Sequence, residues 1–196
     1  MKLDAVVCGA AGQGVLTLSK VLTKAALSEG FEAKCVAWFG IAKTEGPVWA
    51  HVRLGTPVGP SPKIRRKSAG AMVALDRLEA MKHAHYLARG ALVLLDETGM
   101  PPVYSSCGDK GYPSPEDAAE VFSGMELNLI PAQEIAAAVG SIKLCGAVML
   151  GALCALRPLV DRDQLVLALR EEEPQQADLE AEAFFAGYSF ITGKEV

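Results

Sequence analysis

The segment VVCGAAGQGVLTLSK, residues 6–20, constrains the fold more than any other stretch of the chain. Its apolar start predicts a buried strand, and from Val15 the apolar residues recur with the spacing of a helix face. Gly9, Gly12 and Gly14 lie between the two. A glycine turn between a strand and a helix exposes backbone N–H groups and a helix N-terminus, which favour an anion. The segment therefore predicts either a phosphate or anion site, or a tight turn needed only for helix–strand packing.

The order of these glycines is G-x-x-G-x-G, which differs from the G-x-G-x-x-G of dinucleotide-binding domains. The Lys-Ser/Thr ending of a P-loop is also missing. Gln13 carries an amide that can donate and accept, so it either contacts a ligand or subunit or bonds a neighbouring loop. Lys43 is a further candidate phosphate contact. The candidate cofactor-binding residues are Gly9, Gly12, Gln13, Gly14 and Lys43.

Strand-like and helical runs alternate along the chain, which predicts an α/β domain layered as helices, sheet and helices, with a mostly parallel or mixed sheet. The expected strands are Ala5–Cys8, Glu32–Trp38, Val48–Leu54, Ala71–Leu75, Ala91–Leu95 and Glu126–Ile130. Helices are expected from Val15 to about Gly30 and over Leu78–Leu87, Ala132–Val139, 144–156, 161–172 and Ala177–Tyr188. The portion from about 131 to 196 is thus helical. Asp76 and Asp96 end two strands and are expected to act as helix caps or turn residues.

Length and charge limit the functions that the chain can have. Its 196 residues, 51% of them hydrophobic, suit one domain over 1–196. A net charge of −4 argues against nucleic acid as a partner, and the short cluster Lys63–Lys67 is expected to be a solvated loop. No run is apolar enough to span a membrane or to act as a signal peptide, so we expect a cytoplasmic protein.

Cysteine usage argues against disulfides and metal sites. The five cysteines, at 8, 35, 107, 145 and 154, include no CxxC pair, and an iron–sulfur cluster usually needs four ligands in tight groups. The three histidines do not supply a metal site either. No metal ligands and no catalytic residues are assigned.

The segment Val48–Leu54 alternates between apolar residues and a second set, Trp49, His51 and Arg53, that faces the other way. This second face is expected to be exposed, either as a strand surface in solvent or as a subunit contact or anion site. Trp38 and Trp49 suit packing, or an interface.

Several motifs, each weak alone, occur in an order that resembles the gamma subunit or gamma domain of the 2-oxoacid:ferredoxin oxidoreductases. The motifs are GAAGQGV at 9–15, GPVWAHVRLG at 46–55, SP at 61–62, IPAQEIA at 130–136, MLGA at 149–152 and AFFAGY at 183–188. The resemblance covers nearly the whole chain. The family includes the enzymes that act on pyruvate, ketoisovalerate, 2-oxoglutarate and indolepyruvate.

The resemblance implies a non-redox subunit that is inactive alone and works with thiamine-binding and iron–sulfur subunits, with ferredoxin served through the complex. Thiamine diphosphate, iron–sulfur clusters and coenzyme A are expected in the assembled complex, and none is expected to be bound by this chain alone. The chain would shape the active-site and coenzyme A region and the subunit interface. The candidate interface residues are Gly46, Pro47, Trp49, His51 and Arg53.

Some positions depart from the family pattern and bear on the coenzyme A contacts. They are Thr44, Glu45, Ser141, Gly146 and Glu180. Two alternatives therefore stay open: a stand-alone phosphate- or nucleotide-binding α/β module, and a structural or regulatory homologue that has lost its coenzyme A contacts. The sequence does not indicate which 2-oxoacid is used or the subunit stoichiometry.

Overall fold

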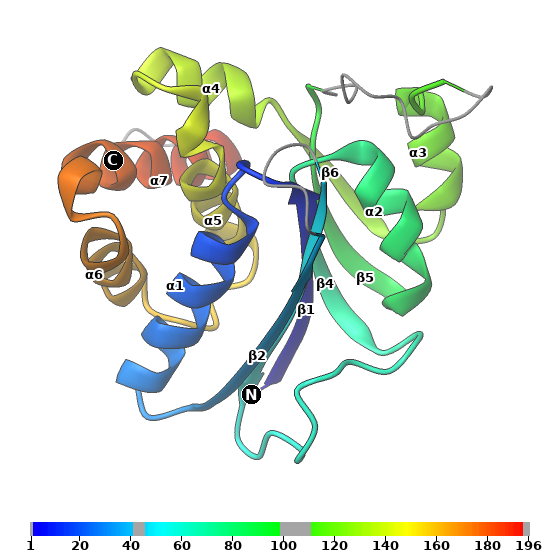
Figure 1. Ribbon diagram of the computed structural model, residues 1–196, viewed down its shortest axis with the longest axis horizontal. Coiled ribbons are helices and arrows are strands. Elements are labelled where there is room, and N and C mark those ends of the chain that lie inside the picture. The colour runs from blue at the N-terminus through cyan, green and yellow to red at the C-terminus, as the bar shows by residue number, and fades with distance from the viewer. Residues whose placement is uncertain (1, 41–45, 99–110, 194–196) are drawn as a thin grey trace.

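The computed structural model describes residues 2–40, 46–98 and 111–193 and places a six-stranded sheet between two layers of helices (Figure 1). The strand order is β2-β3-β1-β4-β5-β6. Strands β1, β4, β5 and β6 pair in parallel, whereas β3 runs antiparallel to both of its neighbours, β2 and β1. The sheet is therefore mixed. The strands are β1 Lys2–Ala10, β2 Glu32–Phe39, β3 Pro47–Gly55, β4 Ala69–Ala74, β5 Leu87–Asp96 and β6 Glu126–Ile130.

Helices cover both faces of the sheet, as the sequence predicts (Figure 1). One face packs against α1, α4, α5, α6 and α7, and the other against α2 and α3, so each face has its own apolar core. The helices are α1 Val15–Ser28, α2 Arg77–His83, α3 Pro115–Val121, α4 Ala132–Val139, α5 Cys145–Leu156, α6 Arg162–Glu172 and α7 Ala177–Thr192. Short 3₁₀ turns follow α2 (η1, Ala84–Tyr86), precede α5 (η3, Ile142–Leu144) and precede α7 (η4, Pro174–Gln176).

Two local expectations are wrong in detail. The helix predicted over Leu78–Leu87 ends at His83, because Leu87 already pairs with Ala69 as the start of β5. Asp161 caps α6 as predicted, since its side chain accepts from the backbone N–H groups of Asp163 and Gln164. The reciprocal half of a capping box is missing, because the Asp161 N–H donates to Glu29 instead.

The apolar run near residue 150 forms α5, a helix buried on nearly all sides. Its length falls short of a membrane span, and no helix in the described part of the chain is long and apolar enough to cross a bilayer. Two glycines let α5 and α7 touch backbone to backbone. A Cβ at Gly151 would overlap the Phe184 carbonyl oxygen, and one at Gly187 would overlap that of Val148. The α5–α7 crossing therefore requires glycine at both positions.

Candidate functional site

The turn between β1 and α1, residues 9–14, is called the glycine loop below. Gly12 and Gly14 have φ angles of 92° and 93°, in the left-handed region that residues with a side chain rarely adopt. Gly14 caps α1, and the N–H groups of the first helical turn lack partners within the helix. The Ala11 N–H donates to the Gly46 carbonyl oxygen over 2.8 Å, which ties the loop to the start of β3. The loop thus presents backbone donors at the carboxyl end of β1, next to the start of β3.

Gln13 folds back onto the loop that carries it. Its Oε1 accepts from the Ala10 N–H at 2.6 Å. A Cβ at Gly9 would lie 2.7 Å from this oxygen, so glycine at position 9 leaves room for the side chain of Gln13. The structural bond of Gln13 is therefore within its own turn and not to a neighbouring loop as expected, and the amide also lines a cavity beside the loop.

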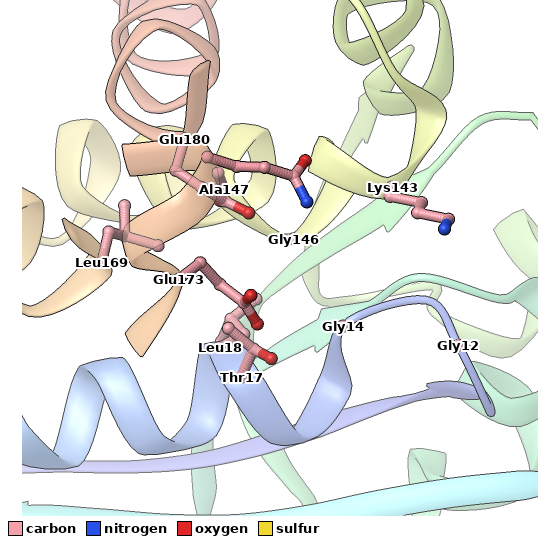
Figure 2. Close-up of a pocket in the computed structure, with 11 residues that line it drawn as sticks. Gly12, Gly14, Thr17, Leu18, Lys143, Gly146, Ala147, Leu169, Glu173 and Glu180 are labelled. Carbon is pink, nitrogen blue, oxygen red and sulfur yellow. The ribbon is translucent and has the colours of Figure 1, made fainter. Parts of the chain in front are cut away.

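Three cavities surround the glycine loop. An apolar cavity of about 550 Å³ lies toward Phe39 and Val48. A second, of about 220 Å³, is lined by Gln13, Gln133 and Lys143 among others, and so contains an amine and two amides. The third, of about 180 Å³, lies between the starts of α1, α5 and α7 (Figure 2). The loop is therefore accessible from three directions that differ in polarity.

Two carboxyl groups, those of Glu173 and Glu180, line the 180 Å³ cavity (Figure 2). The Glu180 residue is only 8% exposed, and no hydrogen bond or ion pair to it is present among the described residues. Burial, with a smaller contribution from Glu173, raises the pKa of Glu180 to about 7. Lys143 also lines this cavity, but its side chain points away from both glutamates (Figure 2). This cavity is therefore unfavourable for a phosphate, which the two carboxyl groups would repel.

The acids at the strand ends have the structural roles that the sequence predicts. Asp76 caps α2 by accepting from the Glu79 N–H at 2.9 Å, and it also accepts from the Tyr112 hydroxyl. Asp96 accepts from the Thr98 N–H at 3.2 Å and from Gln133 Nε2 at 2.8 Å. Both carboxylates are thus engaged in structural hydrogen bonds.

Asp96 also lies beside a buried thiol. The Cys145 Sγ is 3.7 Å from the Asp96 carboxylate, and burial raises the pKa of this thiol. Among the described cysteines, Cys35 alone is exposed. No group of three or more potential metal ligands forms in the ranges that the structure covers.

The expectation that His51 and Arg53 are exposed is wrong. His51 is 2% exposed, and its Nδ1 accepts from the Ile64 N–H at 3.0 Å. The Arg53 side chain is 12% exposed, pairs with Asp4 at 2.8 Å and donates to the Ser61 carbonyl oxygen at 2.7 Å. The chain after β3 folds back and supplies Ile64 and Ser61, whereas Asp4 comes from the neighbouring strand β1. Both side chains do face away from α1, as the alternation predicts, but other residues of the same chain cover them.

The remaining predicted site residues are scattered around the glycine loop and along β3. Gly46 is buried and bonded to Ala11, and Pro47 is exposed at the start of β3. Trp49 is half-buried and stacks on Trp38 with ring centroids 5.6 Å apart. Lys43, and with it Thr44, Glu45 and Cys107, lies outside the described residues. The interface and cofactor roles of these residues stay predictions.

Sequence reasoning missed two features of this region. One is Asp4, the partner of Arg53, which is signalled only by a lone acid in an apolar strand directly opposite position 53 in the register. The other is the pair formed by Glu173 and Glu180. Glu180 stood out as a departure from the family, but nothing in the sequence placed it beside Glu173.

Comparison with known proteins decides the family. The model of the pyruvate ferredoxin/flavodoxin oxidoreductase family matches residues 4–190. The chain belongs to this family. Indolepyruvate oxidoreductase subunit IorB from Archaeoglobus fulgidus is 32% identical over 155 residues, which cover 78% of this chain and 76% of that subunit.

Solved structures share the fold. The gamma subunit of a keto/oxoacid ferredoxin oxidoreductase from Geobacter sulfurreducens superposes with a TM-score of 0.73 at 19% identity, covering 98% of this chain and 99% of that one. The 2-oxoglutarate:ferredoxin oxidoreductase from Magnetococcus marinus, solved with 2-oxoglutarate, coenzyme A and succinyl-CoA bound, gives 0.78 at 18% identity. That match covers 100% of this chain and 32% of the longer one. The expected family and α/β fold are confirmed.

Proposed function

We propose that this chain is the non-redox gamma subunit of a thiamine-dependent 2-oxoacid:ferredoxin oxidoreductase complex, folded as one domain and located in the cytoplasm. The observation that carries the proposal is the match of the family model to residues 4–190, nearly the whole chain. Because relatives that are 32% identical are indolepyruvate oxidoreductase subunits, we assign the complex to the indolepyruvate type. The partner chains would bind thiamine diphosphate and iron–sulfur clusters and pass electrons to ferredoxin.

Within the complex, the glycine loop would contribute to the coenzyme A region. Coenzyme A, when bound, supplies the thiol that accepts the acyl group. The residues on the 220 Å³ side fit its phosphates, because Lys143 and the amides of Gln13 and Gln133 line that cavity beside the loop. Glu173 and Glu180 make the 180 Å³ side a poor fit. The phosphate contact is therefore assigned to Gly12, Gln13 and Lys143, which line the 220 Å³ cavity.

The two carboxyl groups are also the observation that favours the second candidate, a structural or regulatory homologue without coenzyme A contacts. In that case the chain would join the complex, but Lys143 would have no effect on the use of coenzyme A. A stand-alone phosphate-binding module would not join the complex at all.

Purification of the tagged chain from its native cell separates these possibilities. Recovery with a thiamine-binding, cluster-bearing chain supports the subunit, and recovery alone contradicts it. In the purified complex, Lys143→Gln is expected to raise the KM for coenzyme A about tenfold with little change in kcat, because a uniform binding contact is lost. Lys20→Gln removes the same charge from the exposed side of α1 and serves as the control. Equal KM values for the two variants would indicate the homologue without coenzyme A contacts.

A further inference from the structure

The stretch Lys63-Ile64-Arg65-Arg66-Lys67, called the basic segment below, concentrates positive charge on a chain whose net charge is −4. Its four basic residues are exposed, whereas Ile64 is buried. Within the described residues none of these four makes a salt bridge, in contrast to Lys20 and Lys24, which both pair with Glu172. The segment is thus a local surplus of unneutralised cations.

The backbone of the basic segment is bonded to two other parts of the chain, β3 and η1, and to the residue that follows it. The Ile64 N–H donates to His51 Nδ1, and the Lys67 N–H donates to the His85 carbonyl oxygen at 3.1 Å. The Ser68 hydroxyl donates to the Arg65 carbonyl oxygen at 2.7 Å. Lys67 has a φ of 59°, which is uncommon for a residue with a side chain. These bonds fix the backbone, so little backbone ordering remains when the cations engage a ligand.

An aromatic surface continues the basic segment. The Lys63 Nζ lies 5.7 Å from the centroid of the Trp38 ring, and Trp38 stacks on Trp49. Both tryptophans and Tyr86 are only half-buried. Aromatic and Arg side chains are enriched at protein interfaces, where a basic rim around an apolar centre gives orientation and specificity. The composition of this surface therefore suits contact with a protein.

We propose that the basic segment, together with Trp38, docks a carboxylate-rich surface of another chain in the oxidoreductase assembly. This inference rests on the proposed function, because the occupant is a subunit of that complex. Charge complementarity carries it: four exposed cations on a bonded backbone, without a salt bridge among the described residues, attract carboxylates, and Arg65 and Arg66 can each bind one in a bidentate manner. Ile64 is buried, so the basic segment exposes no apolar side chain that could insert into a membrane, and a net charge of −4 disfavours nucleic acid.

The basic segment and the glycine loop lie near opposite ends of β1. The connection that carries the basic segment leaves β3 at Gly55, which pairs with Lys2 at the start of β1. The glycine loop follows the other end of β1 (Figure 1). Trp38 lies nearer to the loop, because it pairs with Trp49, which in turn pairs with Cys8 two residues before the end of β1. The proposed surface therefore extends along the sheet from the basic segment toward the glycine-loop end.

The first experiment measures binding of a short fluorescent poly-glutamate peptide to the full chain. Arg65→Gln/Arg66→Gln is expected to weaken binding about tenfold, since two charged contacts are lost. Lys20→Gln/Lys24→Gln removes the same charge elsewhere and should leave affinity within about twofold. Both tryptophans of the chain lie at the surface, so their emission should change with peptide and report the site. Equal loss in both variants, or tighter binding of an RNA oligonucleotide or of phosphatidylserine vesicles than of the peptide, would overturn the proposal.

The second experiment uses the purified native complex and a carbodiimide, which joins an amine directly to a carboxylate. Lys63 or Lys67 should link to carboxylates of another subunit, whereas Lys20 and Lys24 should link to Glu172 of the same chain and so report that the reagent works. If the internal link forms while neither Lys63 nor Lys67 is joined to another subunit, the docking surface lies elsewhere. Purification of the chain without any partner would instead contradict the proposed function.

Discussion

The regions at the two ends of β1 are stabilised by different kinds of contact. At its carboxyl end the glycine loop is made of backbone groups, and its shape depends on two positive φ angles and a single side-chain bond from Gln13. Beside its start, the region that includes His51, Arg53 and the basic segment is made of side chains that bond across the chain. The backbone turn depends mainly on local geometry, so a substitution there acts through backbone strain. The side-chain network depends on charged and titratable groups, so the stability of that region is sensitive to charge and pH.

The largest expected effect is on the side-chain end. Arg53→Ala leaves the buried carboxylate of Asp4 without its main partner, so we expect a loss of about 3 kcal/mol in the free energy of unfolding. Arg65→Ala, which removes an exposed and unpaired charge, should change it by less than about 0.5 kcal/mol. Urea unfolding of both variants measures the difference. Equal losses in the two variants would mean that the Arg53–Asp4 ion pair does not stabilise its end of β1.

Acid should lower the stability of the region around His51. Burial, followed by the nearby His83, His85, Lys63 and Arg53, lowers the pKa of His51 to about 4. Because the unfolded chain binds a proton more readily, the stability due to neutral His51 is complete above about pH 6.5 and is lost as the pH falls toward 4. We expect a loss of about 2 kcal/mol between pH 6.5 and 4.5. His51→Gln should flatten this dependence, whereas His85→Gln, at an exposed site, should keep it.

The glycine-loop end should respond to pH with the opposite sign. Burial beside Glu173 raises the pKa of Glu180 to about 7, so the folded chain holds a proton that the unfolded chain releases near 4.5. The stability linked to this proton is complete below about pH 4.5 and is lost as the pH rises through 7. The effect of Glu180→Gln on the free energy of unfolding, measured against the unchanged chain, should therefore be between about 1 and 2 kcal/mol more stabilising at pH 8 than at pH 5. The exposed neighbour Glu182, changed to Gln, is the control, and an equal gain there would remove the assignment to the cavity.

The smallest expected effect is in the loop itself. A Cβ at Gly12 would meet nothing within 4 Å, so Gly12→Ala costs only the strain of a φ near 92°, about 1 kcal/mol. Gly70→Ala, in β4 at a φ that needs no glycine, should cost nothing or stabilise slightly. Melting curves measured in parallel test the contrast. If the two substitutions had the same effect, the loop would not be strained.

The sequence predicted the glycine-loop end better than the other end, because the signals there are local. The spacing of Gly12 and Gly14 between a strand and a helix was enough to predict a tight glycine turn, and Asp76 was predicted as a cap or turn residue from its position at the end of a strand. The alternation in β3 correctly showed that Arg53 faces away from α1. It could not show that Asp4, 49 residues away along the chain, and the Ser61 carbonyl cover that face. Period-two alternation assigns a side chain to a face of the sheet and carries no information on what packs over that face.

The backbone contact between α5 and α7 also limits how the molecule can move. With Gly151 against Phe184 and Gly187 against Val148, the two backbones are in close contact, and a slide or rotation would bring residues with side chains into the space that only glycine fits, so we expect the pair to move as one body. The start of α5 meets the glycine loop, where a Cβ on Gly146 would lie 3.8 Å from the Gly14 Cα, and the start of α7 carries Glu180. The cavity between them is closed on its other sides by the start of α1 and by the end of α6, which contributes Leu169 and Glu173. Adjustment to a ligand or a partner is therefore expected from α1 with its loop and from the end of α6, and not from a separation of α5 and α7.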